Sequence, residues 1–287
     1  MKQEDFFYTQ LKALVENALA EDIGEGDHST LSTVPATKQG KARLLVKDDG
    51  IIAGMDVAKF IFHKYDPALQ FIQHIEDGSA VKAGDIAFEL MGSARSILTT
   101  ERLVLNCMQR MSGIATYTNS LSSMISHTKA KLLDTRKTTP NFRLLEKKAV
   151  EIGGGKNHRF ALYDMIMLKD NHIDMAGGIG PAILATKHYL KVLGKSLKIE
   201  VETRSLAEVN EVLAEGGVDF IMLDNMSTTE MKKAVALIAG KAKVEASGGI
   251  TEKTIKEIAE TGVDFISVGA LTHSYKSLDL SLKVVIE

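Results

Sequence analysis

The stretch between residues 132 and 173 is rich in basic side chains, and five of them lie around a run of three glycines and where apolar runs end. They are Arg136, Lys137, His158, Arg159 and Lys169. Arginine and lysine hold carboxylates and phosphates through charge-assisted hydrogen bonds, and arginine often makes two of them in parallel. This stretch therefore predicts a pocket for a strongly anionic ligand. Lys147 and Lys148 fall inside a helical pattern instead, so we expect them on a solvated, charged face.

Acidic side chains near the ends of later apolar runs form a second candidate group. Glu200 and Glu202 alternate with apolar residues, which places both carboxylates on one face of an expected strand. Asp224 ends the next apolar run. Glu202 and Asp224 can hold Mg²⁺, which prefers one or two carboxylates plus substrate oxygens. They can equally bind sugar hydroxyls or pair with Lys169, and the residues alone leave these three roles open.

Two glycine-containing turns after the last apolar runs suggest a phosphate site. Ser247, Gly248 and Gly249 precede a helix expected to begin near Thr251, and Gly269-Ala270 follows the next run. Helix N-termini and late loops of α/β barrels bind phosphate through free backbone N–H groups. Tight turns without a ligand are the alternative interpretation.

Alternating strand and helix patterns must position these side chains. The expected strands are Lys131–Asp134, Asp164–Lys169, Leu197–Glu202, Phe220–Leu223, Val244–Ser247 and Phe265–Val268. The expected helices between them are Phe142–Ile152, Ile179–Val192, Leu206–Glu215, Thr229–Ala239 and Thr251–Thr261. Such alternation predicts a parallel sheet, and its even spacing favours a barrel over an open doubly wound sheet. Barrel sites lie at the carboxyl ends of the strands, where the polar residues above fall.

The first part of the chain has a different texture. A helix is expected over Phe6–Leu19, followed by a polar loop at residues 25–30 and, over residues 41–90, a small, mostly antiparallel sheet. Apolar residues from Ile97 to Met111 predict a helix, and Ile114–Ile125 predicts a second one. The C-terminal segment Leu278–Ile286 alternates like a strand and is expected to return to the N-terminal sheet.

Composition narrows the possible classes. With 287 residues, 45% hydrophobic and 25% charged, the chain resembles an ordinary globular protein of one or two domains. A net charge of −2 argues against a nucleic-acid binder that depends on an overall positive field. The single cysteine, Cys107, fits a reducing compartment and is expected to be a small buried hydrophobe. The acidic, interrupted N-terminus is atypical of a signal peptide, so we expect a soluble, cytoplasmic protein.

Several alternative motifs fail on spacing. The sequence lacks a GxGxxG opening a βαβ unit, so a dinucleotide-binding half is not expected. GGGKNH is not a nucleotide P-loop, because Val150 and Asn157 occupy required glycine and hydroxyl positions. His158 and His172 lack zinc-ligand spacing, and we expect His158 to donate a hydrogen bond to an anion.

The motifs together resemble the quinolinate phosphoribosyltransferase family over essentially the whole chain. The matching segments are EDIGEGDHST, TERLVLNCMQRMSGIAT, LLDTRKTTPNFRLLEKKAV, GGGKNHRFALYD, LKDNHI, IEVE, MLDN, ASGGI and VGALTHS. The resemblance implies an α/β protein, with an N-terminal α/β sandwich domain and an incomplete, open, TIM-like α/β barrel. The expected domains are residues 1–112, joined by 276–287, and residues 113–275. Homodimers or multiples of dimers are implied.

The resemblance also implies an activity: conversion of quinolinate and phosphoribosyl pyrophosphate to nicotinate mononucleotide, pyrophosphate and CO₂, with Mg²⁺, in NAD biosynthesis. Arg102 would enter the neighbouring subunit's site, while Arg136, His158 and Arg159 surround the dicarboxylate. Lys137 and Lys169 would face the substrates' negative charge. Glu202 and Asp224 would serve the ribose and the metal. The expected catalytic residues are Lys137, Lys169, Glu202 and Asp224; the other substrate-binding residues are Arg102, Thr135, Arg136, His158, Arg159, Ser247, Gly248, Gly249, Gly269, Ala270 and His273.

Two positions depart from the family pattern. Asn141 stands where glycine is common and Ala161 replaces a usual glycine, from which we expect altered packing rather than lost activity.

Two rival functions remain. The nearest rival is a paralogous phosphoribosyltransferase acting on another base, such as nicotinate. The second is a non-catalytic binding protein on a retained barrel. The retained basic and acidic residues favour the quinolinate enzyme over both.

Overall fold

The computed structural model describes residues 3–285 and divides into two compact units. The first comprises Met1–Asn119, Lys137–Gly154 and Ala270–Glu287, and the second comprises Ser120–Arg136 and Gly155–Gly269. The end residues 1, 2, 286 and 287 of the expected domains lie outside the described part of the chain.

An antiparallel sheet forms the base of the first unit, in the order β12-β1-β5-β3. Its strands are β1 (Gln39–Val46), β3 (Gln70–Gln73), β5 (Ile86–Ser93) and β12 (Leu280–Val284). A short pair, β2 (Gly50–Ile51) and β4 (Ala80–Val81), is also antiparallel. The pairing of β12 with β1 confirms that the C-terminal segment returns to the N-terminal sheet, although Ile286 is not among the described residues.

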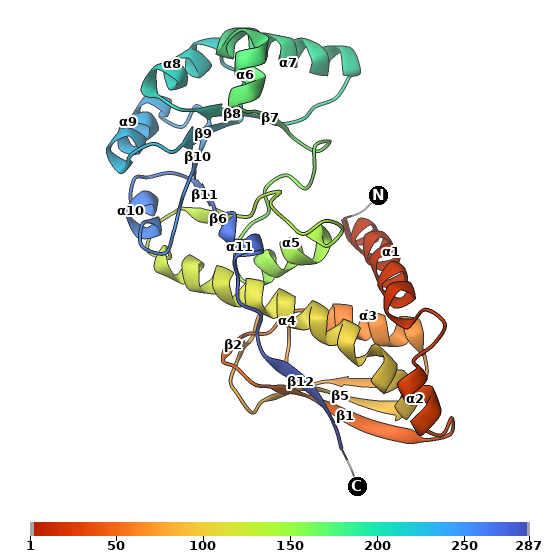
Figure 1. Cartoon of the computed structure of the whole chain (residues 1–287). Helices are drawn as coiled ribbons and strands as arrows, with labels where there is room; N and C mark the ends of the chain where they lie inside the picture. Colours follow the sequence, from red (N-terminus) through yellow and green to blue (C-terminus); the bar gives the residue numbers. More distant parts are fainter. Residues whose placement is uncertain (1–2, 286–287) are drawn as a thin grey trace. The chain divides into compact units, whose positions relative to one another are not determined.

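The first unit also contains helices, which differ in three places from the expectation, and α4 (Ala94–Met124) lies alongside the sheet (Figure 1). They are α1 (Gln3–Ile23), α2 (His28–Thr33), α3 (Met55–Tyr65), α4 (Ala94–Met124), α5 (Arg143–Ile152) and α11 (Ala270–His273). The expected polar loop contains α2, because the Asp27 side chain accepts a hydrogen bond from Thr30 N–H at 3.0 Å and caps a helix there. Helix α3 was not expected, and Met55, Ile61 and Phe62 are buried on its inner face.

Helix α4 is one helix of 31 residues, so the expectation of two helices was wrong. Gly113 lies at the expected break, and a glycine inside a helix costs only about 1 kcal/mol relative to alanine. Its missing side chain has a packing reason, since a Cβ there would lie 2.3 Å from the Lys276 carbonyl oxygen. The chain entering β12 therefore passes directly against α4.

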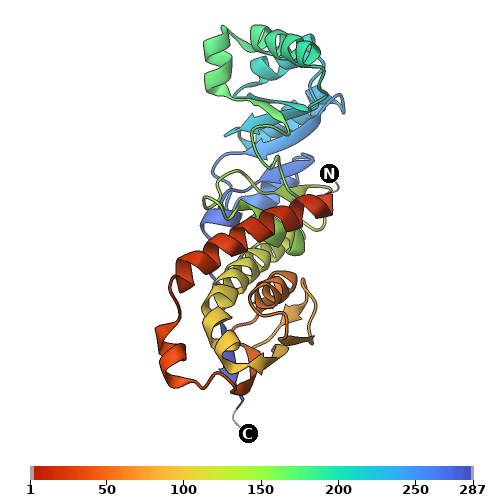
Figure 2. The same cartoon turned by 90° about the vertical axis from the view of Figure 1, so that its right-hand side faces the viewer.

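The core of the first unit lies between α3 and the sheet. Phe62 of α3 contacts Phe88 of β5 edge-to-face, with ring centroids 5.9 Å apart, and Phe71 of β3 lies 4.6 Å from Phe88. Aromatic pairs in this range add to the stability that area burial provides. Figure 2 shows the long α1 and α4 of the same unit, and α1 buries Leu11 and Val15 completely.

Six parallel strands form the second unit, in the order β6-β11-β10-β9-β8-β7. They are β6 (Lys131–Leu133), β7 (Ile166–Leu168), β8 (Ile199–Thr203), β9 (Phe220–Asp224), β10 (Lys243–Ser247) and β11 (Phe265–Ser267). The helices are α6 (Asp170–Ala176), α7 (Ile179–Leu193), α8 (Leu206–Glu215), α9 (Thr228–Ile238) and α10 (Ile255–Ala259). Figure 1 shows α8 and α9 alongside β8–β10. Strands β6 and β7 form the two edges, which makes this sheet the expected incomplete, open barrel.

Two further findings concern single features of the described residues. Cys107 is buried as expected, and burial raises the pKa of its thiol to about 12.

Within residues 3–285, the helices are all too short or too polar to cross a membrane.

Candidate functional site

One face of the parallel sheet carries most of the expected acidic and polar site residues. In a strand, alternate side chains share a face, and the pairing aligns Glu202 with Met222, Met222 with Glu245 and Asp224 with Ser247. Glu200 lies two residues before Glu202 on the same face. The structure thus brings the sequence-predicted residues of β8, β9 and β10 together at the carboxyl end of the sheet.

Three cations lie at or beyond the strand ends of this unit. Arg136 is exposed after β6, and Lys169 is exposed where β7 leads into α6. Arg159 is half-buried and donates from Nη1 to the Met165 carbonyl at 3.2 Å. Burial lowers the pKa of Arg159, and the nearby positive charge of Arg136 lowers it further. The positive charges of the two guanidinium groups repel each other, so a bound anion would be favourable for both.

The His158 side chain is mostly buried, and its ring contacts a buried side chain of the same unit. Its Nε2 lies 2.8 Å from Glu200 Oε2 and 3.5 Å from Glu245 Oε2. Its Nδ1 accepts a hydrogen bond from the Arg159 backbone N–H at 2.7 Å, so the proton of the neutral ring is on Nε2. His158 therefore donates to the buried side chain of Glu200, and burial raises the pKa of that carboxyl group to about 7. The same segment is fixed by His158 N–H, which donates to Asp134 Oδ1 at 2.9 Å.

Glu202 and Asp224 are half-buried neighbours whose charges oppose each other. Burial raises the pKa of Glu202, Asp224 raises it further, and Lys169 opposes both effects. A divalent cation between two such carboxylates removes this repulsion, and carboxylates suit Mg²⁺. The donor set therefore fits the implied metal. Among the described residues, His158, Glu200 and Glu245 also form a compact group of three potential metal ligands. The His158 nitrogen that faces the two carboxyl groups carries a proton, so it cannot coordinate a metal in this state.

The loop after β10 depends on two glycines in the left-handed region. Gly248 has φ +99° and Gly249 has φ +57°. Helix α10 begins at Ile255 rather than near Thr251. Thr251 to Thr254 form a turn that leads into it, in which Thr251 N–H donates to Thr254 Oγ1 at 3.1 Å and the Thr251 carbonyl accepts from Ile255 N–H at 2.9 Å. The expectation of a helix N-terminus directly after the glycines was therefore wrong.

A substitution at Gly248 is expected to disturb this loop strongly. A Cβ there would lie 2.2 Å from Asn225 Oδ1, whereas a Cβ on Gly249 meets no atom within 4 Å. We expect Gly248→Ala to destabilise the protein by about 3 kcal/mol and Gly249→Ala by about 1 kcal/mol, since both strain the backbone and only the first adds a clash. Thermal or urea unfolding of the two variants measures the difference. Equal losses of stability in the two variants would show that the Asn225 side chain can move away from the added Cβ at no cost.

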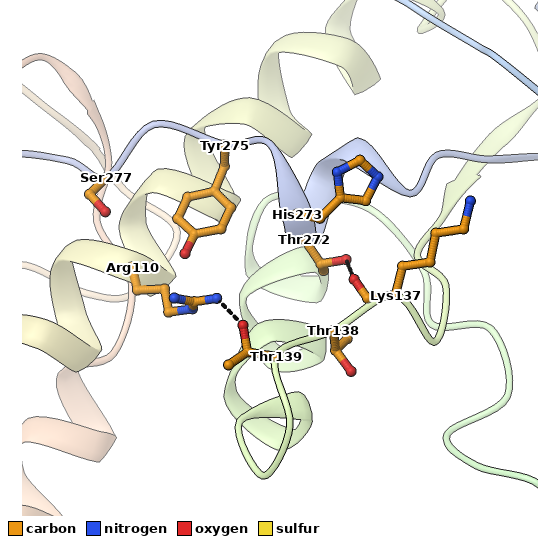
Figure 3. Close-up of a pocket in the computed structure, with 8 residues that line it drawn as sticks. All are labelled: Arg110, Lys137, Thr138, Thr139, Thr272, His273, Tyr275 and Ser277. Carbon is orange, nitrogen blue, oxygen red and sulfur yellow. Dashed lines mark hydrogen bonds between the residues drawn. The ribbon is translucent and has the colours of Figure 1, made fainter.

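The first unit holds a cavity of about 500 Å³ that includes two of the expected site residues (Figure 3). Its lining residues are Arg110, Lys137, Thr138, Thr139, Thr272, His273, Tyr275 and Ser277. Thr272 Oγ1 donates to the Lys137 carbonyl at 2.9 Å and fixes the backbone there. His273 is exposed, with Nδ1 2.7 Å from Ser274 Oγ. Lys137 and His273 thus make this cavity basic.

Arg110 is the feature of this cavity that the sequence analysis missed. Its guanidinium lies 5.3 Å from the Phe142 ring centroid and 5.1 Å from that of Tyr275. Nε donates at 2.9 Å to Glu146, whose carboxylate is completely buried and also accepts from Thr139 N–H at 3.1 Å. A signal existed, because Arg110 and Glu146 interrupt helical apolar patterns, but their pairing depends on the fold.

The remaining expected residues are placed as follows. Arg102 is exposed on α4, and in the part of the chain that the structure describes no hydrogen bond or ion pair engages its side chain. Thr135 is half-buried after β6, while Gly269 and Ala270 are half-buried around the start of α11. Lys147 is only 2% exposed, so its expected place on a solvated face was wrong. Asn141 has φ +63°, a conformation that glycine and asparagine tolerate, which explains the usual glycine there.

The second unit is thus an open parallel barrel with cations and carboxylates at its strand ends. The profile of the quinolinate phosphoribosyl transferase C-terminal domain matches residues 114–283, and that of the N-terminal domain matches residues 27–112. The chain therefore belongs to the quinolinate phosphoribosyltransferase family.

Individual relatives agree over nearly the full length. Quinolinate phosphoribosyltransferase (decarboxylating) 1b of Nicotiana tabacum is 45% identical, over 96% of this chain and 82% of that protein. A probable nicotinate-nucleotide pyrophosphorylase (carboxylating) of Bacillus subtilis is 42% identical, over 97% and 95%. The solved structure of nicotinate-nucleotide pyrophosphorylase from Francisella tularensis has a TM-score of 0.90 and 42% identity, and the match covers 96% of each chain.

Proposed function

We propose that this protein transfers the phosphoribosyl group of 5-phosphoribosyl 1-pyrophosphate to quinolinate with decarboxylation. The products are nicotinate mononucleotide, pyrophosphate and CO₂, as in de novo NAD biosynthesis. The observation that carries this proposal is the match of both halves of the chain to the family. The cations and carboxylates at the strand ends supply the chemistry that the reaction needs.

The dicarboxylate is assigned to the basic residues Arg136, His158 and Arg159, with Arg102 from a neighbouring subunit. Quinolinate carries two carboxylates and nicotinate only one. Arginine forks match carboxylates in geometry as well as charge, so Arg136 and Arg159 chiefly orient the base. The positive charge of Arg136 helps to lower the pKa of Arg159, which supports the assignment of both guanidinium groups to one anionic ligand.

The transfer step makes a bond from the quinolinate ring nitrogen to ribose C1 and breaks the bond from C1 to pyrophosphate oxygen. Positive charge grows on the sugar while negative charge gathers on the leaving group. Lys137 and Lys169 are assigned to neutralise that negative charge, which is larger in the transition state than in the substrate. Thr135 is assigned to substrate binding at the same site.

Decarboxylation follows from the product of that step. The ring nitrogen is now a cationic pyridinium, and it accepts the electron pair left when the adjacent carboxylate departs as CO₂. The ring carbon then takes up a proton. The ring itself is the electron sink, and the protein's part is to hold the ribosylated base in place.

Glu202 and Asp224 are assigned to Mg²⁺ and to the ribose hydroxyls. Bound Mg²⁺ would supply countercharge to the pyrophosphate oxygens. The half-buried, mutually repelling carboxylates support this assignment. The ribose 5′-phosphate is assigned to the turn at Ser247, Gly248 and Gly249, to Gly269-Ala270, and to His273.

A homodimer, or a multiple of dimers, is part of the proposal because of Arg102. Its exposed guanidinium on α4 is available to a second copy. Inactive Arg102→Ala and inactive Lys169→Met proteins can be mixed and allowed to exchange subunits. In a mixed dimer, one of the two sites then has both Lys169 and the neighbouring Arg102. Because about half of the dimers are mixed, the sample should regain roughly a quarter of wild-type activity. Activity that stays at the level of the separate variants after proven exchange would remove Arg102 from the neighbouring site.

We also propose that the protein acts in the cytoplasm, which cell fractionation tests directly. The curated relatives include chloroplastic and mitochondrial proteins of plants, so recovery in an organelle is the contrary outcome.

The experiment that tests the function supplies purified protein with Mg²⁺, phosphoribosyl pyrophosphate and either quinolinate or nicotinate. Turnover of quinolinate alone is the expected result. Turnover of nicotinate would assign the protein to the rival branch that acts on another base. Binding without turnover of either base would favour a non-catalytic binding protein.

A further inference from the structure

Two carboxyl groups are buried in the second unit beneath the expected base-binding residues. Glu200 and Glu245 are both 0% exposed, and with His158 they form a group whose nearest nitrogen and oxygen atoms all lie within 4.8 Å of one another. Two ionised carboxylates cannot persist this close together away from water. One of the two therefore carries a proton.

The hydrogen bonds identify which carboxyl group is neutral. Glu200 Oε2 accepts from His158 Nε2–H at 2.8 Å, so Glu200 has a donor for its charge. Neither oxygen of Glu245, nor Glu200 Oε1, has a hydrogen-bond partner among the described residues. A proton on Glu245, donated to the free oxygen of Glu200, satisfies two of these three atoms with one hydrogen bond.

We propose that Glu245 is a positioning residue that acts as a neutral carboxylic acid, donating to Glu200 so that Glu200 in turn holds the Nε2–H of His158. His158 then presents Nδ1 to the Arg159 backbone N–H and fixes the segment that carries the Arg159 guanidinium. This inference rests on the proposed function, because it takes Arg159 as a quinolinate contact. A core with no such task would place an apolar side chain here, since a buried carboxyl group costs stability.

The electrostatics of Glu245 agree with its geometry. Burial raises the pKa of Glu245 to about 8, and the charge of Glu200 raises it further, while His158 and the hydroxyl of Ser267 on β11 oppose the rise. Met222 of β9 and Phe265 of β11, its register partners, add no charge. The folded state thus binds a proton that the unfolded state releases above pH 4.5. This contribution to stability is present at pH 4.5 and is lost as the pH rises through about 8.

The test compares Glu245→Gln with Glu245→Met, using the exposed Glu211→Gln as the matched control. Glutamine keeps a donor to Glu200 at every pH. We expect Glu245→Gln to keep the KM for quinolinate within about twofold at pH 7, whereas Glu245→Met raises it about tenfold, the effect of one lost hydrogen bond to a charged group. The KM for phosphoribosyl pyrophosphate should change in neither.

The pH dependence separates positioning from mere structure. Between pH 4.5 and about pH 8 the wild-type melting temperature should fall, and above about pH 8 the wild-type KM for quinolinate should rise. Both changes should be reduced in Glu245→Gln. Equal damage from glutamine and methionine, or an unaltered pH dependence in Glu245→Gln, would overturn the proposal. So would a stoichiometric metal ion in the purified protein that is lost in both variants.

A measurement without substrate keeps the inference separate from the proposed function. ¹⁵N spectra of the His158 ring should show the proton on Nε2 in wild type and Glu245→Gln at pH 7, and a changed ring environment in Glu245→Met. If this holds while quinolinate is not turned over, the proposed function fails and the hydrogen-bond chain stands. A proton on Nδ1 in the wild type would refute the chain.

Discussion

Replacing Arg136 by alanine is expected to raise the KM for quinolinate about 100-fold and to leave the KM for phosphoribosyl pyrophosphate nearly unchanged. A hydrogen-bonded contact between charged groups contributes about 1.5–3 kcal/mol, and 1.4 kcal/mol corresponds to a factor of ten. Arg136 is exposed, so folding should survive the change. Steady-state kinetics with each substrate varied in turn measures the effect.

Two variants control this result. Arg136→Lys keeps the charge but loses the planar fork, and should recover only part of the affinity. Arg204→Ala removes another exposed arginine of the same unit, one that pairs with Glu208 at 3.1 Å, and should leave both KM values unchanged. Weakened binding of phosphoribosyl pyrophosphate with intact quinolinate binding would show that Arg136 contacts the other substrate.

Replacing Lys169 by methionine is expected to lower kcat about 100- to 1,000-fold, as removal of one charge-stabilising group does in other enzymes. The pyrophosphate leaving group gathers negative charge as its bond to ribose breaks, so the lysine acts most strongly in the transition state. The KM values should change much less than kcat. Single-turnover rates of pyrophosphate release measure the step itself.

Lys195→Met provides the matched control, because Lys195 is an exposed lysine beyond the end of α7 in the same unit. It should keep wild-type rates. A Lys169→Met protein whose kcat is intact and whose KM alone rises would show that Lys169 binds substrate equally in ground and transition states.

The parallel sheet was predictable because its strands are short, continuous apolar runs bounded by glycine and acidic residues. Strand β9 extends one residue beyond the expected Phe220–Leu223, and β10 begins one residue before the expected Val244. Parallel strands end at a common edge, so the juxtaposition of Glu202, Asp224 and Ser247 also followed from the sequence.

Features that depend on contacts between distant residues were not predictable. Helix α4 continues through Gly113 because the chain near Lys276 packs there, more than 160 residues later in the sequence. Arg110 pairs with Glu146, and Glu245 lies against His158, each across segments that are distant in the sequence. Periodicity describes one element at a time, so it shows Glu245 only as an acid inside an apolar strand.

The central claim, a transfer coupled to decarboxylation of quinolinate, is tested most directly by stoichiometry. Purified protein with Mg²⁺ and phosphoribosyl pyrophosphate would receive quinolinate labelled with ¹³C in the carboxylate next to the ring nitrogen. The account predicts equal amounts of labelled CO₂, pyrophosphate and nicotinate mononucleotide. Pyrophosphate and a nucleotide that retains the label, or a nucleotide formed from nicotinate without CO₂, would contradict it.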